Sequence, residues 1–377
     1  MTFTLFGAGL VSWCLCAATL GPVVSVAPDS DRWEIEGKGR VAEFLGRKAL
    51  CLEGGAAILK DFELKDGVID FDVATAAKRG FLGLQFRING ENGSGEWVYV
   101  RPHKSGLQDA QQYTPFFNGG PAWQIYSGPG FIAPVDIPAD VWFHFRLEVT
   151  GAQAKMYVGD MSKPSLVIDD LKSGNQKGLL ALSVLTGTTY FSNFEVHETP
   201  TSKWERHEPA MPANMLTEWS LSQPFDAADR SLERLPRDLE GMEWQKVTAE
   251  APGFVVINRY RQSPRVNATF GKDSTTRLEP QKGTQVVYAK AVIESDSDQV
   301  KKLSVGYSDE VSVFVNGSIL FRGRSAQYFR DPGFLGIVDV ENDAVYVALK
   351  KGRNELVLAV SELGGGWGFV CRMEDVK

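Results

Sequence analysis

The stretch FLGLQFRINGENGSGEWVYVRP, residues 81 to 102, carries the pattern that decides the fold of this chain. Two runs in which apolar and polar residues alternate are separated by a segment rich in Gly and Asn. Successive side chains of a β-strand point to opposite faces of a sheet, and Gly and Asn favour the turns between strands. The stretch therefore predicts two antiparallel strands, each with an apolar face and a polar face.

Similar runs continue on both sides, from Trp33 to about Glu198, and helical periodicity is nearly absent from them. They read ALCLEG (49–54), AAILKDFEL (56–64), GVIDFDVAT (67–75), AWQIYSG (122–128), WFHFRLEVTG (142–151), AKMYVGD (154–160), GLLALSVL (178–185) and TYFSNFEVHE (189–198). Many short strands at regular spacing are typical of an antiparallel sandwich. Residues 28–198 are therefore predicted to form one β-sandwich.

A second set of strands follows a segment rich in Pro and charged residues, which we interpret as a linker over residues 199–215. These strands read GFVVINRYR (253–261), QVVYAKAVIES (285–295), KKLSVGYS (301–308), EVSVFVNGSILFRG (310–323), AVYVALKKG (344–352), NELVLAVSE (354–362) and WGFVCRME (367–374). Within them, Asn316-Gly317 predicts a type I′ hairpin, although Asn316 also begins a glycan acceptor triplet. The predicted fold class is all-β, with two antiparallel β-sandwich (jelly-roll) domains, the second over residues 216–377.

Composition excludes several classes of protein. The 377 residues include 9 Trp, 22 Phe and 10 Tyr, which is too aromatic for a disordered chain. The 40 basic and 47 acidic residues give a net charge of −7. An acidic chain has no overall attraction for nucleic acid or an anionic membrane, so we expect no nucleic-acid partner.

The N-terminus is predicted to be a secretory signal peptide, residues 1–27. Residues 5–20, LFGAGLVSWCLCAATL, are uncharged but fall short of the ~20 residues that span a bilayer. Ser25-Val26-Ala27 provides a cleavage pattern of small residues, although no Lys or Arg precedes the apolar run. We expect a secreted or periplasmic protein with no membrane span after cleavage. The alternative is an uncleaved N-terminal anchor.

Cysteine and histidine usage gives little support for metal or redox chemistry. Cleavage would leave only Cys51 and Cys371, which we expect to be two buried thiols rather than a disulfide. The four histidines are scattered, with no HExxH or H-x-H pair, so no metal site or cofactor is predicted. A calcium-binding site is left open, although the sequence has no recognised calcium loop motif. The acids in predicted loops that could supply ligands are Asp66, Asp160, Asp169 and Asp170.

Residues 66–194 resemble the exported concanavalin A-like (laminin-G or lectin/glucanase) sandwiches, including the 3-keto-disaccharide hydrolase-like domains. The resemblance rests on DGVIDFDV, FLGLQFR, WVYVRPHKSG, DAQQYTP, WQIYSGPGF, VWFHFRLEVTG and the closing FSNFEV. It implies the fold, whereas members of this group include hydrolases, lyases, lectins and adhesion modules.

Residues 287–372 resemble the galactose-binding-like jelly rolls that accompany β-galactosidases and sialate esterases. SDEVSVFVNGSILFRG and LKKGRNELVLAVSELGGGWGF carry this resemblance. Such modules are usually accessory, and no catalytic domain of either enzyme type is present in the sequence. The ELGGGWGF segment is interpreted as a tight turn or bulge that folds Trp367 against the sheet, because no helix follows it to cradle a phosphate.

A polar face of the first sandwich is the predicted ligand site. Leu84, Phe86, Val98 and Val100 would point into the core, so the intervening residues share the other face. The predicted face consists of Gln85, Arg87, Tyr99, Arg101, Gln124 and Tyr126, and a loop adds His103, Asp109, Gln112 and Tyr113 at its rim. Fixed planar hydrogen-bonding groups beside aromatic rings suit sugars. The alternative is that Arg87, Arg101 and Asp109 merely form an ion-pair network under a loop.

Catalysis has weaker support. Hydrolysis of a glycosidic bond needs two carboxylates about 5 to 9 Å apart, and Asp70 and Asp72 lie two residues apart on one predicted strand face. The strand lacks the third acid of the E-x-D-x-E pattern found in jelly-roll glucanases. Glu96 and Asp109 are further candidates for the second acid. No G-x-S-x-G nucleophile motif occurs.

These observations predict an exported, non-catalytic carbohydrate-binding protein whose partner is a carbohydrate or a glycan-bearing ligand. Whether the chain is an enzyme stays open; if so, it would hydrolyse glycosidic bonds through Asp70 or Asp72. A third reading is a protein-docking or adhesion module. In the second sandwich, RSAQYFRDPGF (324–334) is predicted to be a long exposed loop with polar tips.

Overall fold

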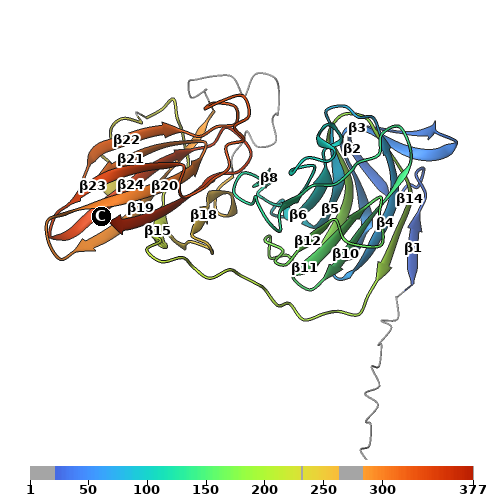
Figure 1. Ribbon diagram of the computed structural model, residues 1–377, viewed down its shortest axis with the longest axis horizontal. Helices are drawn as coiled ribbons and strands as arrows, with labels where there is room; N and C mark the ends of the chain where they lie inside the picture. Colours follow the sequence, from blue (N-terminus) through green and yellow to red (C-terminus); the bar gives the residue numbers. More distant parts are fainter. Residues whose placement is uncertain (1–21, 231, 263–282, 377) are drawn as a thin grey trace, which may run out of the picture.

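The computed structural model describes residues 22–230, 232–262 and 283–376. The described chain is almost entirely β-structure, which confirms the predicted fold class. Figure 1 shows two β-sandwiches side by side, with the segment after β14 crossing between them along one edge.

The first sandwich is a 14-stranded antiparallel sheet that folds over on itself. Its elements are β1 (Val23–Val26), β2 (Trp33–Phe44), β3 (Arg47–Leu64), β4 (Gly67–Thr75), β5 (Phe81–Asn89), β6 (Ser94–Val100), the 3-10 helix η1 (Pro102–Lys104), β7 (Gln111–Phe117), β8 (Gly120–Pro121), β9 (Ile132–Ala133), β10 (Phe143–Thr150), β11 (Gln153–Val158), β12 (Leu166–Ile168), β13 (Gly178–Thr186) and β14 (Thr189–Glu198). The main strand order is β12-β11-β10-β4-β14-β3-β13-β5-β6-β7-β8.

Strand β3 joins the two layers of this sandwich. Its first part pairs with β14 through Leu50–Leu52, and the part from Gly55 onward pairs with β13. The crossing lies at Gly54-Gly55, where φ is positive and a Cβ on Gly55 would lie 1.9 Å from the carbonyl oxygen of Glu36. Only glycine fits such an approach without strain.

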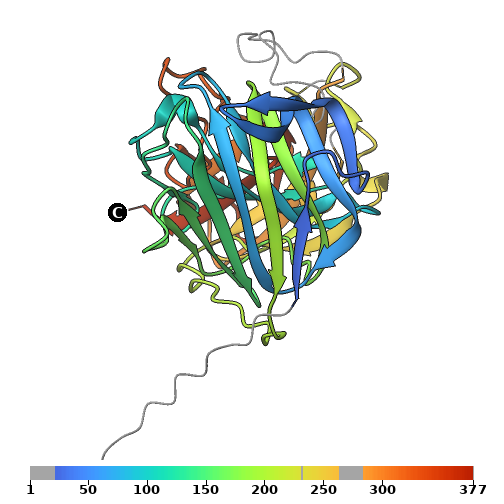
Figure 2. The same ribbon diagram turned by 90° about the vertical axis from the view of Figure 1, so that its right-hand side faces the viewer.

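The two layers enclose one apolar core and present two different outer faces. Leu84, Phe86, Val98 and Val100 are fully buried in that core, as the alternation predicted. The layer with β4, β10 and β14 faces away from the second sandwich (Figure 2). The layer with β5, β6 and β7 faces toward it (Figure 1).

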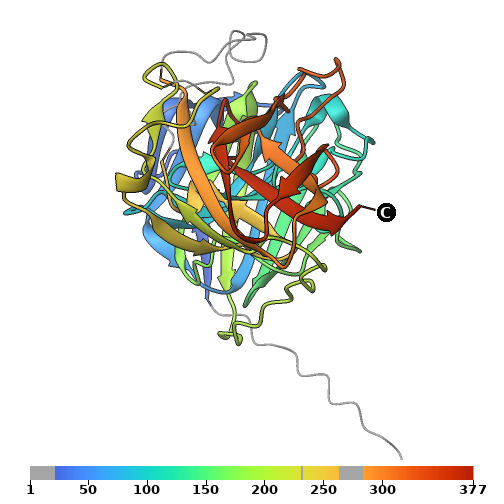
Figure 3. The ribbon, with the colours of Figure 1, turned by 90° about the vertical axis from the view of Figure 1, so that its left-hand side faces the viewer.

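The second sandwich has two antiparallel sheets, seen in Figure 3 from the side away from the first sandwich. Its elements are β15 (Glu218–Leu221), β16 (Phe225–Asp226), η2 (Leu239–Gly241), β17 (Gln245–Thr248), β18 (Phe254–Val256), η3 (Ile257–Arg259), β19 (Gln285–Ser295), β20 (Gln299–Ser308), β21 (Glu310–Val315), β22 (Ser318–Arg324), β23 (Asp343–Leu349), β24 (Gly352–Ser361) and β25 (Gly368–Asp375). The sheet orders are β17-β15-β19-β24-β21-β22 and β18-β25-β20-β23. Asn316 and Gly317 both have positive φ between β21 and β22, which confirms the predicted hairpin.

Cys51 and Cys371 are free and buried in different sandwiches, which confirms the prediction of two thiols. Trp367 is fully buried behind the Gly364–Gly366 turn, as expected.

The predicted domain boundaries remain predictions, but the strands agree with their order. No strand lies between β14 and β15, in a segment that the structure describes throughout. Most of the predicted signal peptide lies outside the described residues. Its last part forms β1, which pairs with β14 through Val23–Val26. Among described residues, no helix is long and apolar enough to cross a bilayer.

Candidate functional site

The two sandwiches meet along a seam whose central residue is Gln124. This side chain is fully buried, and all its polar groups are used by the second sandwich. Its Nε2 donates to the carbonyl oxygen of Leu335 at 3.1 Å, and its Oε1 accepts from the Ser308 hydroxyl at 3.0 Å. Its backbone N–H donates to the Gly365 carbonyl, and its backbone carbonyl accepts from the Val338 N–H. Buried polar groups satisfied in this way fix the two sandwiches against each other.

Two glycines of the second sandwich make room for Gln124. A Cβ on Gly365 would lie 2.3 Å from Gln124 Oε1, and one on Gly336 would lie 2.4 Å from Gln124 Nε2. Both glycines have positive φ, which favours glycine over other residues. The triple glycine of ELGGGWGF therefore serves the seam as well as the packing of Trp367.

A second anchor of the seam centres on Tyr126. Its hydroxyl donates to the carboxylate of Glu250 and accepts from Arg259 Nη2 at 3.1 Å. Arg259 also pairs with Glu250 at 2.8 Å and donates to the Lys172 carbonyl. An apolar cluster that includes Ile125 continues the contact across the seam. Hydrogen bonds, an ion pair and apolar packing thus hold the sandwiches together.

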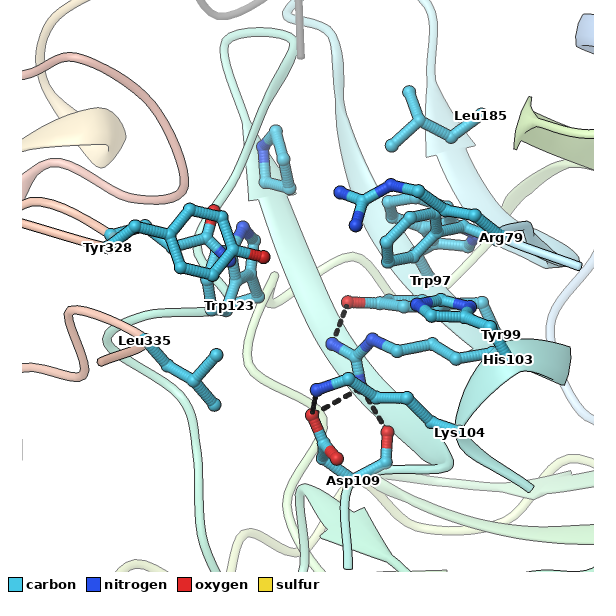
Figure 4. Close-up of a pocket in the computed structure, with 14 residues that line it drawn as sticks. Arg79, Trp97, Tyr99, His103, Lys104, Asp109, Trp123, Leu185, Tyr328 and Leu335 are labelled. Carbon is cyan, nitrogen blue, oxygen red and sulfur yellow. Dashed lines mark hydrogen bonds and ion pairs between the residues drawn. The ribbon is translucent and has the colours of Figure 1, made fainter. Parts of the chain in front are cut away.

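Beside the seam lies a groove with one wall from each sandwich (Figure 4). Its lining residues are Arg79, Phe81, Trp97, Tyr99, Arg101, His103, Lys104, Asp109, Pro121, Trp123 and Leu185 from the first sandwich, and Gln327, Tyr328 and Leu335 from the second. Both walls carry aromatic rings. In Figure 4, Lys104 and Asp109 lie toward one end of the groove, and Arg79 lies beside Trp97 toward the other end. We take this groove as the candidate site.

The floor of the groove is an aromatic and arginine-bearing sheet face. Trp97 and Tyr99 are two residues apart on β6, with ring centroids 4.3 Å apart. The Arg101 guanidinium lies 4.9 Å from the Tyr99 ring centroid and donates to the Tyr99 hydroxyl at 3.0 Å. That hydroxyl donates to Gln112 Oε1 at 2.8 Å, and Arg101 also donates to this oxygen. The network locks the floor in one geometry before any ligand arrives.

The rim of the groove carries opposite charges. Lys104 is ion-paired with Asp109, and Arg101 Nη1 lies 3.9 Å from the same carboxylate. Burial lowers the pKa of His103, and the positive charges of neighbouring Arg and Lys residues lower it further. Lowering the pKa of an imidazole favours its neutral form at pH 7, in which one ring nitrogen donates and the other accepts.

The opposite wall comes from the predicted exposed loop of the second sandwich. Tyr328 is 39% exposed and has φ +64, a conformation that is uncommon for a non-glycine residue. Its ring points into the groove from the side opposite Tyr99 (Figure 4). Its backbone N–H donates to the Phe334 carbonyl, which ties the loop across its base. The loop therefore places an exposed aromatic ring against a rigid floor.

A larger cavity of about 650 Å³ also lies along the seam, lined by residues 125–132, 168–170 and 337–339 among others. Size alone would favour it as a site. However, Asp170 and Lys172, two of the charged residues that line it, are paired with each other at 2.7 Å, and Asp170 also pairs with Arg206. The groove combines the exposed ring of Tyr328 and several largely buried aromatic rings with convergent polar groups, so we prefer it on chemical grounds.

The structure brings five of the predicted ligand-binding residues together at or beneath the groove. Tyr99, Arg101, His103 and Asp109 line it, and Gln112 supports its floor. Gln85 lies on the same sheet face, opposite Trp97 in the strand register, but does not line the groove. Of the alternative ion-pair network, Arg101 and Asp109 lie 3.9 Å apart, whereas Arg87 pairs with Asp66 instead.

Gln124 and Tyr126 do not occupy the predicted strand face. The predicted strand over residues 122–128 is wrong, because Ile125 and Tyr126 both donate their N–H groups to the Ala122 carbonyl and form a turn. Both side chains form their hydrogen bonds across the seam instead.

Arg87 and Tyr113 also depart from the predicted face. At Arg87 φ is +49 and the β5–β6 register shifts, so the guanidinium turns inward and pairs with Asp66 at 3.0 Å. Tyr113 points into the core and donates to Glu96 at 2.7 Å. Burial raises the pKa of Glu96, which is fully buried. Glu96 therefore sits inside the sandwich and away from the groove.

Asp70 and Asp72 lie on the outer face of the β4 and β10 layer, opposite the groove. His144 bridges them, with Nε2 2.9 Å from Asp70 Oδ1 and Nδ1 2.8 Å from Asp72 Oδ1. Arg146 pairs with Asp70 at 2.7 Å, and Arg47 pairs with Asp72 at 2.6 Å. These five residues make a paired surface cluster on the face opposite Asp109, and Glu96 lies inside the sandwich.

The sequence interpretation missed several lining residues. Trp97 follows from the alternation that placed Tyr99 and Arg101 on the polar face, because it is the preceding residue on that face. Arg79, Phe81 and Lys104 flank predicted residues closely in sequence. Tyr328 stood out only as part of an exposed loop, since nothing in the sequence joins it to residues more than 200 positions earlier.

Within the described ranges, no three His, Cys, Asp or Glu side chains come together in a way that could hold a metal ion. Asp66, one of the possible calcium ligands, accepts from Arg87 and from the backbone N–H groups of Gly151 and Ser202. Asp66 therefore accepts hydrogen bonds within the protein interior.

No protein-family model matches the chain, and no curated protein sequence matches it. Solved structures are similar in fold. The carbohydrate binding module CBM66 from Bacillus subtilis is 20% identical, and the match covers 47% of this chain and 96% of that chain with a TM-score of 0.32. A protein of unknown function with a galectin-like fold, also from Bacillus subtilis, is 13% identical, with 49% and 99% covered and a TM-score of 0.36.

Domain 4 of AbnA, a GH43 extracellular arabinanase from Geobacillus stearothermophilus, in complex with arabinotriose, is 12% identical. That match covers 48% of this chain and 85% of that chain, with a TM-score of 0.28. At these identities and TM-scores, the likenesses carry no argument about what this chain binds. Its function is inferred below from the residues of its own site.

Proposed function

We propose that the protein binds carbohydrate in the groove between its two sandwiches and does not cleave it. The observation that supports this most directly is the pairing of two aromatic walls around fixed polar groups. Trp97 and Tyr99 belong to the floor on the side of the first sandwich, and Tyr328 stands opposite them on a loop of the other sandwich. Sugars present C–H faces that pack on aromatic rings and hydroxyls that need oriented donors and acceptors. The Arg101 network supplies such orientation.

Binding without turnover is favoured by the distribution of carboxylates. Among the described residues that line the groove, Asp109 is the single carboxylate. Hydrolysis by the common mechanisms needs a second carboxyl group within about 5 to 9.5 Å across the bond. Asp70 and Asp72 are on the other side of the sandwich, and Glu96 is enclosed in the core. The concanavalin A-like subtype and export through a signal peptide are part of this proposal.

The test compares neighbouring aromatic residues of one loop. Tyr328→Ala removes a groove wall, whereas Phe329→Ala removes a ring that is 41% exposed and does not line the groove. Loss of a stacked ring is worth roughly 1 kcal/mol, or somewhat under tenfold in affinity. On a glycan array followed by calorimetry, we expect wild type and Phe329→Ala to bind the same glycan and Tyr328→Ala to bind it several-fold more weakly.

The same samples separate the rival functions. Release of reducing sugar from a bound polysaccharide, lost in Asp109→Asn, would make the protein a glycoside hydrolase and overturn the non-catalytic proposal. Equal glycan affinity in Tyr328→Ala and Phe329→Ala would show that the glycan site lies outside the groove. Absence of binding across a broad array would favour the protein-docking alternative.

A further inference from the structure

The groove has the opposite charge to the protein as a whole. The chain carries a net charge of −7, yet Arg79, Arg101 and Lys104 line the groove against a single carboxylate, Asp109. The pKa of His103 is lowered first by burial and then by these three cations, which is the effect expected of a locally positive field. A narrow cationic site on an acidic protein concentrates anionic ligands.

Arg79 differs from the other cations because its guanidinium is uncommitted. Arg101 is engaged by Tyr99, Gln112 and the Asp109 carbonyl, and Lys104 is paired with the Asp109 carboxylate. Arg79 is exposed and makes no hydrogen bond or ion pair with any residue that the structure describes. Its guanidinium lies 5.6 Å from the ring centroid of Phe81 and reaches into the groove (Figure 4). A planar, uncommitted guanidinium is suited to bidentate contact with an anionic group.

The size of the groove limits what can enter it. Its cavity volume is about 50 Å³. One water needs roughly 10 to 15 Å³ of such volume, so the groove holds about four groups of this size. A carboxylate or a sulfate ester fits that space, whereas a whole sugar ring with its hydroxyls is larger. A sugar would therefore place a substituent in the groove and its ring at the mouth.

From these three observations we infer that the groove selects acidic glycans, taking the carboxylate of a uronate or a sulfate ester against Arg79. The ring that bears this group lies across the mouth, within reach of the Tyr328 ring. This inference rests on the proposed carbohydrate binding and adds the class of its ligand. Neutral sugars offer Arg79 only uncharged hydroxyl acceptors and therefore bind more weakly.

Matched oligosaccharide pairs test the inference on the full chain by calorimetry at physiological ionic strength. The first pair is oligogalacturonate and its fully methyl-esterified form. The second is a sulfated galactan oligosaccharide and its chemically desulfated form. We expect the acidic member of at least one pair to bind about tenfold or more tightly than its neutral partner, and the productive pair identifies carboxylate or sulfate as the preferred group.

Two arginine variants separate a specific contact from general attraction. Arg79→Gln removes the uncommitted guanidinium, and Arg353→Gln removes an exposed arginine at the start of β24, outside the groove lining. Both variants lose one positive charge. We expect Arg79→Gln to abolish the acidic preference and Arg353→Gln to retain it, with thermal melting as a check that both are folded.

The remaining outcomes are distinguishable. Equal affinity for acidic and neutral members, with binding still weakened in Tyr328→Ala, would overturn the acidic preference and leave the carbohydrate proposal standing. An acidic preference that persists in Arg79→Gln would overturn the assignment to this groove. If neither member of either pair binds and a broad neutral array is also silent, both the inference and the proposed function fail.

Discussion

The two outer faces of the first sandwich use charged residues in opposite ways. On the β4 and β10 face, Asp70 and Asp72 are each paired with His144 and with an arginine, so the cluster is closed upon itself. On the β5 and β6 face, the Arg101 network lies among aromatic rings, and Arg79 contacts the Phe81 ring but makes no hydrogen bond or ion pair with any described residue. In the sequence, the strands of both faces show the same alternation of apolar and polar residues.

The difference between them is the second sandwich. It stands against the β5 and β6 face, adds Tyr328 and Leu335 as a wall, and turns a polar sheet face into a groove. Asp70 and Asp72 are thus paired with basic side chains on a face that no second domain frames, whereas the basic residues of the other face line the candidate groove because the second sandwich frames it.

The largest expected effect comes from separating the two walls. In Gly365→Ala, a Cβ would meet Gln124 Oε1 at 2.3 Å in a residue with φ +101. Because four hydrogen bonds hold Gln124, it cannot yield freely. We expect a stability loss on the order of 2 to 3 kcal/mol and loss of glycan binding, measured by denaturant unfolding and calorimetry.

Gly352→Ala is the matched control for that variant. Gly352 has φ +91, but no atom lies within 4 Å of its would-be Cβ. It therefore carries the backbone strain without the contact at the seam. Glycan binding as weak in Gly352→Ala as in Gly365→Ala would mean that the seam does not support the groove.

A smaller, pH-dependent effect should arise from Asp309, which holds the glycine turn of the seam. It is almost fully buried and accepts from the N–H groups of Leu363 and Gly364, and burial raises its pKa to about 7. A raised pKa in the folded state means that this residue's contribution to stability is complete below its unfolded pKa of about 3.9 and declines as pH rises through 7.

Asp309→Asn should remove that decline, because the amide stays neutral and its oxygen can still accept both backbone N–H groups. We expect the wild-type Tm to fall between pH 5 and pH 8 relative to the variant. Asp296→Asn replaces an exposed carboxylate of the same sandwich and should keep the wild-type profile. Parallel profiles for wild type and Asp309→Asn would contradict the assignment.

Alternation along the chain predicted the strands well because each strand buries one face in a local core. Leu84, Val98 and their neighbours needed no knowledge of distant residues to be placed. Arg87 and Gln124 could not be placed in this way. A bulge turns Arg87 toward Asp66, and Gln124 is held by residues about 180 to 240 positions later in the chain. Such conformations follow from tertiary contacts, which outweigh the local pattern.

The smallest effect should come from the closed cluster on the opposite face. Burial would raise the pKa of Asp72, but hydrogen bonds from His144, Asn193 and Arg47 outweigh it and lower this pKa. A lowered pKa adds stability above the unfolded value that is lost as pH falls through the folded value. His144 is one third exposed, so solvent screening limits the loss in His144→Gln to about 0.5 to 1 kcal/mol at pH 7.

Glycan binding in His144→Gln should equal that of wild type, because the cluster and the groove lie on opposite faces of the sandwich. His197→Gln is a suitable comparison, since its ring is 3.8 Å from Glu195 and pairs with no second carboxylate among the residues that the structure describes. We expect it to lose less stability than His144→Gln in the same denaturant titration. A loss of glycan affinity in His144→Gln, at unchanged fold, would show that the two faces are coupled and that the closed cluster is more than a solvated surface.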